Sequence, residues 1–96
     1  MANRFEQVDE VVEDAITIAL EQRADGQWAR VYCPQTAHPS LNVDRISEPI
    51  PPKDALSGAV RLANKLKLAI VVVDPDGVWK KEWGELYREQ DDAEGE

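Results

Sequence analysis

The N-terminal segment has the spacing of a short amphipathic helix. Within residues 4–13, Phe5, Val8 and Val12 recur at intervals of three and four, with acidic residues between them. Apolar residues at this spacing share one face of a helix. Asn3 precedes the pattern, where a side-chain oxygen can accept a hydrogen bond from the first helical turn. The pattern therefore predicts a short helix capped by Asn3.

The longest helical pattern covers residues 52–66. Its apolar residues would form one broad stripe along a helix: Ala55, Leu56, Ala59, Val60, Leu62, Ala63 and Leu66. Pro52 suits the first turn, where its missing N–H has no helical partner, and Lys65 suits the negative end of the helix dipole. The apolar run over 68–73 then predicts a strand that is buried on both faces.

Two alternating runs, residues 16–22 and 28–33, flank Asp25 and Gly26. This dipeptide between alternating strands predicts a hairpin, because a type I′ turn needs a positive φ at both central residues. A two-residue loop at this point would pair Ile18 with Cys33 on one face. The same register would set the opposite face as Arg23 across from Trp28, Glu21 from Arg30 and Ala19 from Tyr32. One face is then almost wholly apolar, and a slip of one residue would mix the two.

The second hairpin face is the candidate interaction face, and it carries Arg23, Trp28, Arg30 and Tyr32. Tryptophan, tyrosine and arginine are enriched at interface hot spots. A helix covers only one face of a two-layer domain, so the other can stay open. Three coverings remain possible for it: another segment of the same chain, a protein partner or second copy, or a stacked single-stranded nucleic acid.

Residues 34–51 form a polar, proline-rich connection. A long stretch without secondary structure is unusual inside a small domain, so the sequence NVDRI at 42–46 is expected to add an edge strand. The only cysteine, Cys33, directly precedes this connection, and the only histidine, His38, lies within it. Two ligands do not complete a zinc site, and a nucleophile and base would need an orienting third group. We expect Cys33 to be buried and His38 to be a loop residue.

Asp74, Pro75, Asp76 and Gly77 follow the apolar strand and have the residue types of a metal or phosphate loop. An EF-hand alignment on the glycine would place Val72 and Trp83 at ligand positions, and neither binds calcium. The glycines and lysine of a phosphate loop are absent. We interpret the four residues as a turn. Two continuations remain open: a charged edge strand and a brief helix over 84–90, which we favour, or a helix that begins at Asp74.

Charge is unevenly distributed in a chain of 96 residues with net charge −8. Residues 1–14 carry five acids and one base, and residues 85–96 carry six acids and one base, so the segment between them is nearly neutral. Acidic ends oppose unaided binding to phosphate backbones. No apolar run approaches the length of a membrane span, and the first residues lack an apolar signal core, so we expect a cytoplasmic protein without a membrane partner.

The chain resembles small bacterial domains of ββαββ type to which no activity is assigned. The resemblance covers residues 16–83 and rests on turn and packing residues: Asp25, Gly26 and Trp28, then Ala55, Ala59 and Ala63, then Asp76 and Gly77. It implies the fold and no function. The acidic N-terminal segment and the long proline-rich connection depart from the pattern.

These observations predict a single α+β domain over residues 1–90 and a disordered acidic tail over 91–96. The expected architecture is two-layered, with an antiparallel sheet of three to four strands, the main helix over 52–66 and the short N-terminal helix. The residues favour a non-enzymatic protein-interaction module, with a homodimer as its simplest form. They identify no catalytic, metal or cofactor residues. The alternatives are a small enzyme or ligand-binding domain without a recognisable motif, and a single-stranded nucleic-acid binder.

Overall fold

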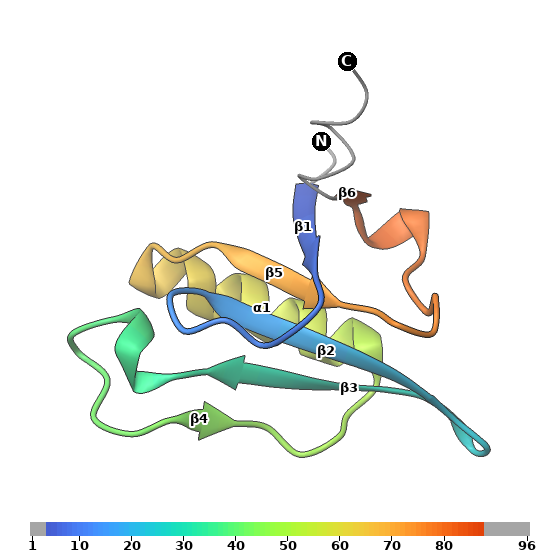
Figure 1. Ribbon diagram of the computed structural model, residues 1–96, viewed down its shortest axis with the longest axis horizontal. Helices are drawn as coiled ribbons and strands as arrows, with labels where there is room; N and C mark the ends of the chain where they lie inside the picture. Colours follow the sequence, from blue (N-terminus) through green and yellow to red (C-terminus); the bar gives the residue numbers. More distant parts are fainter. Residues whose placement is uncertain (1–3, 88–96) are drawn as a thin grey trace.

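Within residues 4–87, which the computed structural model describes (Arg4 by its backbone alone), the chain forms a mixed six-stranded sheet with one α-helix across it (Figure 1). The strands are β1 (Arg4–Val8), β2 (Ile16–Arg23), β3 (Gly26–Cys33), β4 (Arg45–Ile46), β5 (Ile70–Val73) and β6 (Glu85–Tyr87). The helix is α1 (Pro52–Leu66), and η1 (Gln35–Ala37) and η2 (Lys81–Trp83) are short 3₁₀ turns. The α+β class and the main helix are confirmed, and the expected antiparallel sheet of three or four strands is wrong.

The strand order is β4-β3-β2-β5-β1-β6. The hairpin strands β2 and β3 are antiparallel, as are β3 and β4, whereas β5 runs parallel to both β2 and β1, and β1 runs parallel to β6. The parallel pairs follow from the connections. Helix α1 leads the chain from the β4 edge across the hairpin to β5, and such a crossover returns a strand in the parallel direction.

The expected N-terminal helix is a strand instead. Phe5 lies opposite Leu86 of β6, and Val8 lies opposite Val73 of β5, so β1 fills a place between two strands from the other end of the chain. The helical spacing of its apolar residues is real, but pairing on both sides satisfies the backbone and buries Phe5. Tertiary pairing overrides local pattern here.

Residues 9–15 connect β1 to β2, and they cross the sheet on the face opposite α1 (Figure 1). Because β5 lies between these two strands, the connection has to pass over one face of it. The backbone N–H of Val12 donates to the Thr17 Oγ1 at 3.2 Å, and both Thr17 and Val71 beneath the connection are buried. One end of this face is therefore covered by the chain itself.

The hairpin forms with the two predicted faces but in a different register. Arg23 lies opposite Gly26, Glu21 opposite Trp28 and Leu20 opposite Ala29, so the two-residue loop lies one residue earlier than predicted and consists of Ala24 and Asp25. Gly26 alone has a positive φ at this turn, 135°, which excludes the type I′ turn that needs two. A shift of two residues keeps every side chain on its predicted face.

Helix α1 packs on the sheet through its alanines. Ala55 and Ala59 are fully buried, and they allow a close approach to Ile18 and Val72, which form the centre of the core. The predicted helix bounds are confirmed. The helix ends at Leu66, and the φ of 60° at the next residue, Lys67, lets the N–H of Leu68 donate to the carbonyl of Ala63 in the last turn.

The residues from Asp74 to Gly77 are a turn, as the sequence predicted. Both carboxylate oxygens of the buried Asp74 accept backbone N–H groups, Val78 at 2.7 Å and Trp79 at 2.9 Å. Gly77 takes a positive φ of 70°, which glycine adopts without strain. The two continuations that the sequence left open are both wrong within the described residues, because η2 and the strand β6 follow the turn.

The proline-rich connection contributes the expected edge strand, β4, which pairs with the end of β3. A further bridge joins Ala29 and Ile50, so the connection follows β3 for most of its length. The acidic tail expected over 91–96 lies outside the described residues.

Candidate functional site

The candidate interaction face is the side of the β2–β3 hairpin that α1 does not cover, which we call the open hairpin face. Alternation along the strands places Glu21, Arg23, Trp28, Arg30 and Tyr32 on it. Helix α1 lies behind the hairpin, in contact with the opposite face (Figure 1). The structure thus brings all four predicted residues to one surface, of which Trp28, Arg30 and Tyr32 are half-buried and Arg23 is exposed.

The hairpin tip is held by polar contacts that the predicted register did not contain. Trp28 stands opposite Glu21, and its indole Nε1 donates to the Asp25 Oδ1 at 3.0 Å. Arg23 pairs along its own strand with Glu21, with 2.6 Å between Nε and Oε2. The expected cross-strand partnership of Arg23 and Trp28 is wrong, because the register is shifted by two residues.

Glu21 and Arg23 each stabilise the charged form of the other. The hydrogen bond from Arg23 lowers the pKa of Glu21, with a smaller contribution from the nearby charge of Arg30, and the same hydrogen bond raises the pKa of Arg23. Both side chains are exposed, so their attraction is screened by solvent. The pair holds the arginine along its own strand, beside Glu21.

Arg30 has a different environment from Arg23. It lies opposite Ala19, its Nε is buried, and that atom has no hydrogen-bond partner among the described residues. The structure also shows no ion pair for its guanidinium within residues 4–87. A buried donor without a partner is unfavourable, and it distinguishes Arg30 from the neighbouring polar groups of the hairpin tip.

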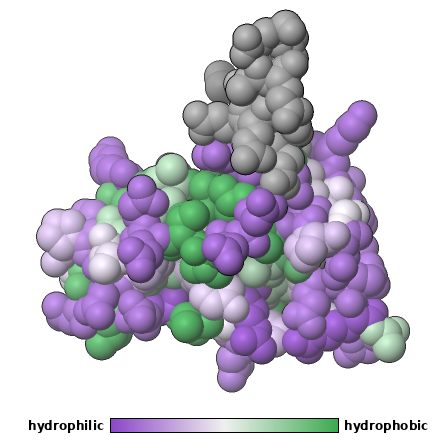
Figure 2. All heavy atoms as spheres, viewed as in Figure 1, coloured by the Kyte–Doolittle hydropathy of each residue, from purple (hydrophilic) through white to green (hydrophobic). Residues whose placement is uncertain are grey.

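The sequence reasoning missed two exposed apolar residues on this side of the sheet. Tyr32 pairs with Ile46 of β4, which places the isoleucine side chain on the same face, where it is 59% exposed. Val11, in the connection across this face, is 45% exposed. Figure 2 shows hydrophobic residues at the centre of this side among hydrophilic ones. The sequence NVDRI predicted an edge strand, but it did not indicate the direction of that strand or the strand with which it pairs.

Cys33 and His38 do not form a reactive pair. Cys33 is buried under α1, and this burial raises the pKa of its thiol, with a weaker opposing effect of Arg45. The Nδ1 of His38 is engaged with the Ser40 side chain, 2.8 Å away. Within residues 4–87, no group of three or more His, Cys, Asp or Glu residues is placed to hold a metal ion.

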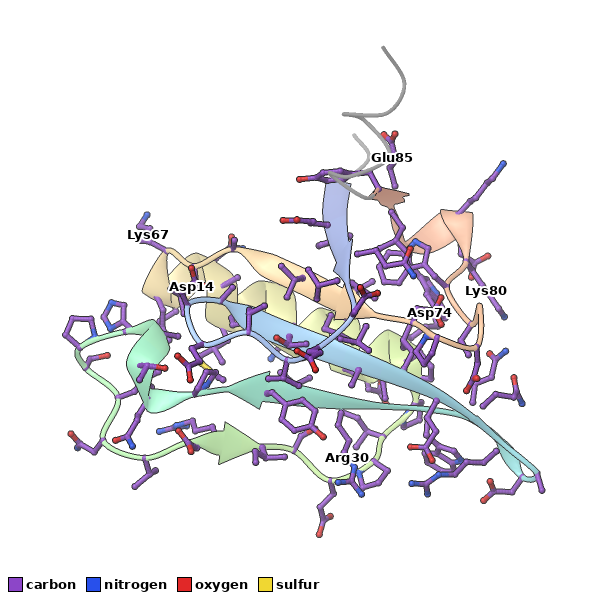
Figure 3. The ribbon with its side chains drawn as sticks, in the orientation of Figure 1. Asp14, Arg30, Lys67, Asp74, Lys80 and Glu85 are labelled. Atoms are coloured by element: carbon purple, nitrogen blue, oxygen red, sulfur yellow. The ribbon has the colours of Figure 1, made fainter. Side chains whose placement is uncertain are left out.

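The carboxylates of the turn that follows β5 are structural. Asp74 holds the turn, and the Asp76 Oδ2 accepts the backbone N–H of Gln22 at 3.2 Å. Strand β2 pairs with β5 only as far as Ala19, so this contact supplies an acceptor where the sheet pairing has ended. The turn therefore supports the projecting end of the hairpin (Figure 3).

In comparisons with protein family models, with curated proteins and with solved structures, nothing matches this chain. In the part of the chain that the structure describes, no helix has the length and apolar character needed to cross a membrane.

Proposed function

We propose that this protein is a non-enzymatic interaction module that binds a second copy of itself through the open hairpin face. The observation that carries the proposal is the environment of Trp28, Arg30 and Tyr32: two large aromatic residues flank an arginine on a sheet face that has no helix over it. Monomers seldom leave such a surface to solvent, and these residue types dominate the energetics of interfaces.

Charge favours a second copy over an unrelated acidic or basic partner. The open hairpin face carries Arg23 and Arg30 against Glu21 and Asp25, so it is locally neutral in a chain of net charge −8. Two identical neutral faces can meet in an isologous dimer without local repulsion. Nucleic acid is disfavoured, because the connection over residues 9–15 adds acids on this side and offers no base.

A bacterial cytoplasm is the setting that fits this proposal. The free thiol of Cys33 is buried under α1, and a chain of this size needs no disulfide to fold. The resemblance to small bacterial domains points the same way.

Sedimentation equilibrium of the wild type and of Trp28→Ala tests the proposal. We expect the wild type to dimerise at micromolar concentration, and the substitution to cost about 2 kcal/mol of association energy, or about thirtyfold in Kd. Gln27→Ala is the matched control, because this neighbouring residue points to the other face of the hairpin. Thermal unfolding of both variants separates loss of association from loss of the hairpin tip.

A wild type that remains monomeric at high concentration would contradict self-association. Salt provides a second readout, since raising ionic strength screens the repulsion between two chains of charge −8 and is expected to strengthen the dimer. A dimer that dissociates as salt rises would instead be held by exposed ion pairs rather than by the aromatic residues of this face.

A further inference from the structure

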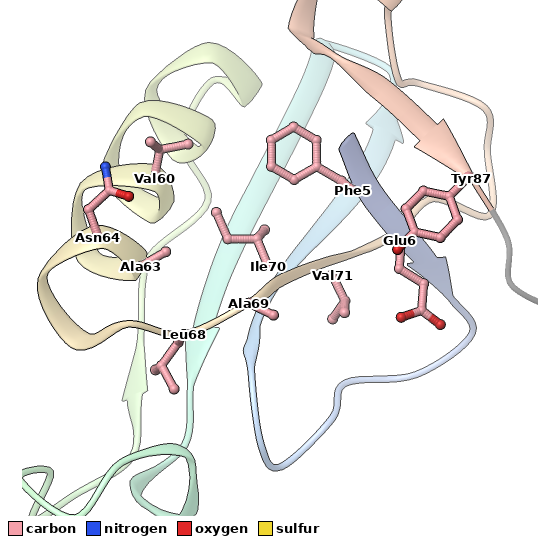
Figure 4. Close-up of a pocket in the computed structure, with 10 residues that line it drawn as sticks. All are labelled: Phe5, Glu6, Val60, Ala63, Asn64, Leu68, Ala69, Ile70, Val71 and Tyr87. Atoms are coloured by element: carbon pink, nitrogen blue, oxygen red, sulfur yellow. The ribbon is translucent and has the colours of Figure 1, made fainter. Parts of the chain in front are cut away.

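Two adjoining hollows run along one flank of α1, on the side of the sheet opposite the open hairpin face. One has a volume of about 330 Å³ and the other about 440 Å³, and Val60 and Asn64 of the helix line both. We call this pair of hollows the α1 trough. Figure 4 shows the first hollow, where Phe5 points from β1 toward the helix and Ile70 lies between them. The second continues toward the N-terminal half of α1, as far as Lys53.

The far wall of the α1 trough is aromatic. The rings of Phe5 and Trp79 meet edge to face at a centroid distance of 5.4 Å, and Trp79 and Trp83 repeat this arrangement at 5.4 Å. Phe5 lines the first hollow and Trp83 lines the second. On the helix side, Leu56 and Val60 complete an apolar channel whose volume is typical of small-molecule sites.

The second hollow of the α1 trough carries more positive than negative charge. Lys53 and Arg61 line the second hollow, and the Lys80 ammonium lies 5.8 Å from the centre of the Trp83 ring. Glu82 is the one acid among the lining residues of that hollow. Neither Lys53 nor Arg61 forms an ion pair within the described chain. The protein has a net charge of −8, so the excess of basic residues in this hollow is a local feature that the overall composition does not explain.

A larger hollow, about 620 Å³, lies between β4 and the other flank of α1, but its charges do not select a ligand. Asp44 and Asp54 stand against the single Arg45 there, and the Asp44 carboxylate already accepts the backbone N–H of Gln35. The α1 trough differs because its first hollow has no basic lining residue, whereas its second hollow has Lys53 and Arg61. This separation is the complement of a molecule with an apolar body and an anionic head.

We propose that the α1 trough binds an organic carboxylate with an elongated apolar body. The carboxylate lies beside Lys53 and Arg61, and the body lies between α1 and the aromatic wall. The guanidinium of Arg61 can donate to both carboxylate oxygens in a forked pair, which makes it the stronger of the two cationic partners. Asn64, exposed at the junction of the hollows, lies where the body would pass from one to the other.

Titration with decanoate, below its micelle concentration and followed by ¹⁵N–¹H NMR, tests the proposal on the intact chain. The three tryptophan indoles give an internal control. We expect the resonances of Trp79 and Trp83 to move with one saturable Kd, and that of Trp28, on the open hairpin face, to stay in place. Decyltrimethylammonium is the matched probe of opposite charge, and it should bind at least about fivefold more weakly.

Two substitutions on the exposed surface of α1 separate the trough from general charge effects. Arg61→Glu should weaken decanoate binding about fivefold or more, whereas Lys65→Glu, the same charge change on the helix outside the trough, should change it less than about twofold. Asn64→Trp places a large ring at the junction of the hollows and should abolish binding while the protein stays folded.

Several results would overturn the proposal. One is an unshifted Trp83 resonance at saturating decanoate. Another is a loss of binding in Lys65→Glu as large as that in Arg61→Glu, which would reduce the effect to net charge. Equal binding of decanol would show that Lys53 and Arg61 do not contribute to the binding of the carboxylate. If an acidic peptide displaced decanoate and bound at least ten times more tightly, the α1 trough would be a peptide site and not a small-molecule site. None of these results depends on whether the open hairpin face pairs two copies.

Discussion

The two halves of the sheet are stabilised in different ways. Strands β2, β3 and β5 lie under α1, and their core is aliphatic and closely packed around Ile18 and Val72. Strands β1 and β6 form a parallel pair that joins opposite ends of the described chain, and the contact among Phe5, Trp79 and Trp83 supports them. The first half combines a local hairpin with a helix layer, whereas the second depends on non-local pairs.

This difference implies an order of stability. Each strand of the second half is short, and only β1 is paired on both sides. Local unfolding begins where buried apolar contacts are few and backbone pairs are exposed. We therefore expect the β1–β6 half to open without the rest of the sheet, and the hairpin under α1 to open only when the whole domain unfolds.

The largest effect is expected from Ile18→Ala. The side chain is 1% exposed in the helix-covered half, and its removal leaves a cavity between β2 and α1, at a cost of about 3 kcal/mol. Urea denaturation measures this loss. Val11→Ala is the control, because that residue is 45% exposed and should change the free energy of unfolding by less than about 0.5 kcal/mol. Comparable losses in both variants would contradict the position of the core.

Trp79→Ala should have a smaller and more localised effect. The half-buried ring contacts both other members of the aromatic wall, and its Nε1 donates to the Gly84 carbonyl at 3.0 Å, so its loss should cost about 2 kcal/mol. Native-state hydrogen exchange should then show faster exchange in β1 and β6 and unchanged protection in β2 and β3. Uniform loss of protection would mean that the two halves unfold as one unit.

The smallest expected effect concerns the reactivity of the Cys33 thiol, which measures how often the helix-covered half opens. A water-soluble disulfide reagent should react slowly in the native state, because the side chain is 1% exposed and burial raises its pKa, and rapidly in denaturant. Gln7→Cys in a Cys33→Ala background is the matched probe in β1, and it should react faster. Rapid native labelling of Cys33 would contradict both its burial and the comparison.

The same pKa shift gives a dependence on pH. Because the folded state raises the pKa of Cys33, the unfolded chain ionises first, so this stabilising contribution is complete below the pKa of the unfolded thiol. It is lost as pH rises through the folded value. Urea denaturation above pH 9, the ordinary value for a thiol, should show a decline that Cys33→Ala lacks.

The sequence predicted the helix-covered half because its signals are local. Pro52 and the alanine stripe define α1, and alternation assigns every hairpin side chain to its face even though the predicted register was wrong by two residues. The turn itself could not be read correctly, since Asp25-Gly26 permits two positive φ values and only Gly26 uses one. A shift by an even number of residues leaves the faces unchanged.

The other half was missed because its determinants are far apart in the chain. Phe5 and Val8 fit a helix by spacing, and only their pairing with Leu86 and Val73 makes them a strand. The candidate interaction face could be predicted because apolar and polar residues alternate along the two hairpin strands. Its neighbour Ile46 and the aromatic wall depend on contacts between distant segments, which no local pattern indicates.

The shortest strands of the sheet lie at its two edges. Strand β4 has two residues and β6 has three, whereas β2 and β3, with eight each, are interior. A long unpaired edge is a template for uncontrolled addition of further chains, which leads to fibrils and precipitation. Edge strands of this length provide little template, so growth by strand addition is poorly supported. The short edges therefore protect the chain from aggregation at high concentration, and the association that we propose uses a sheet face instead of an edge.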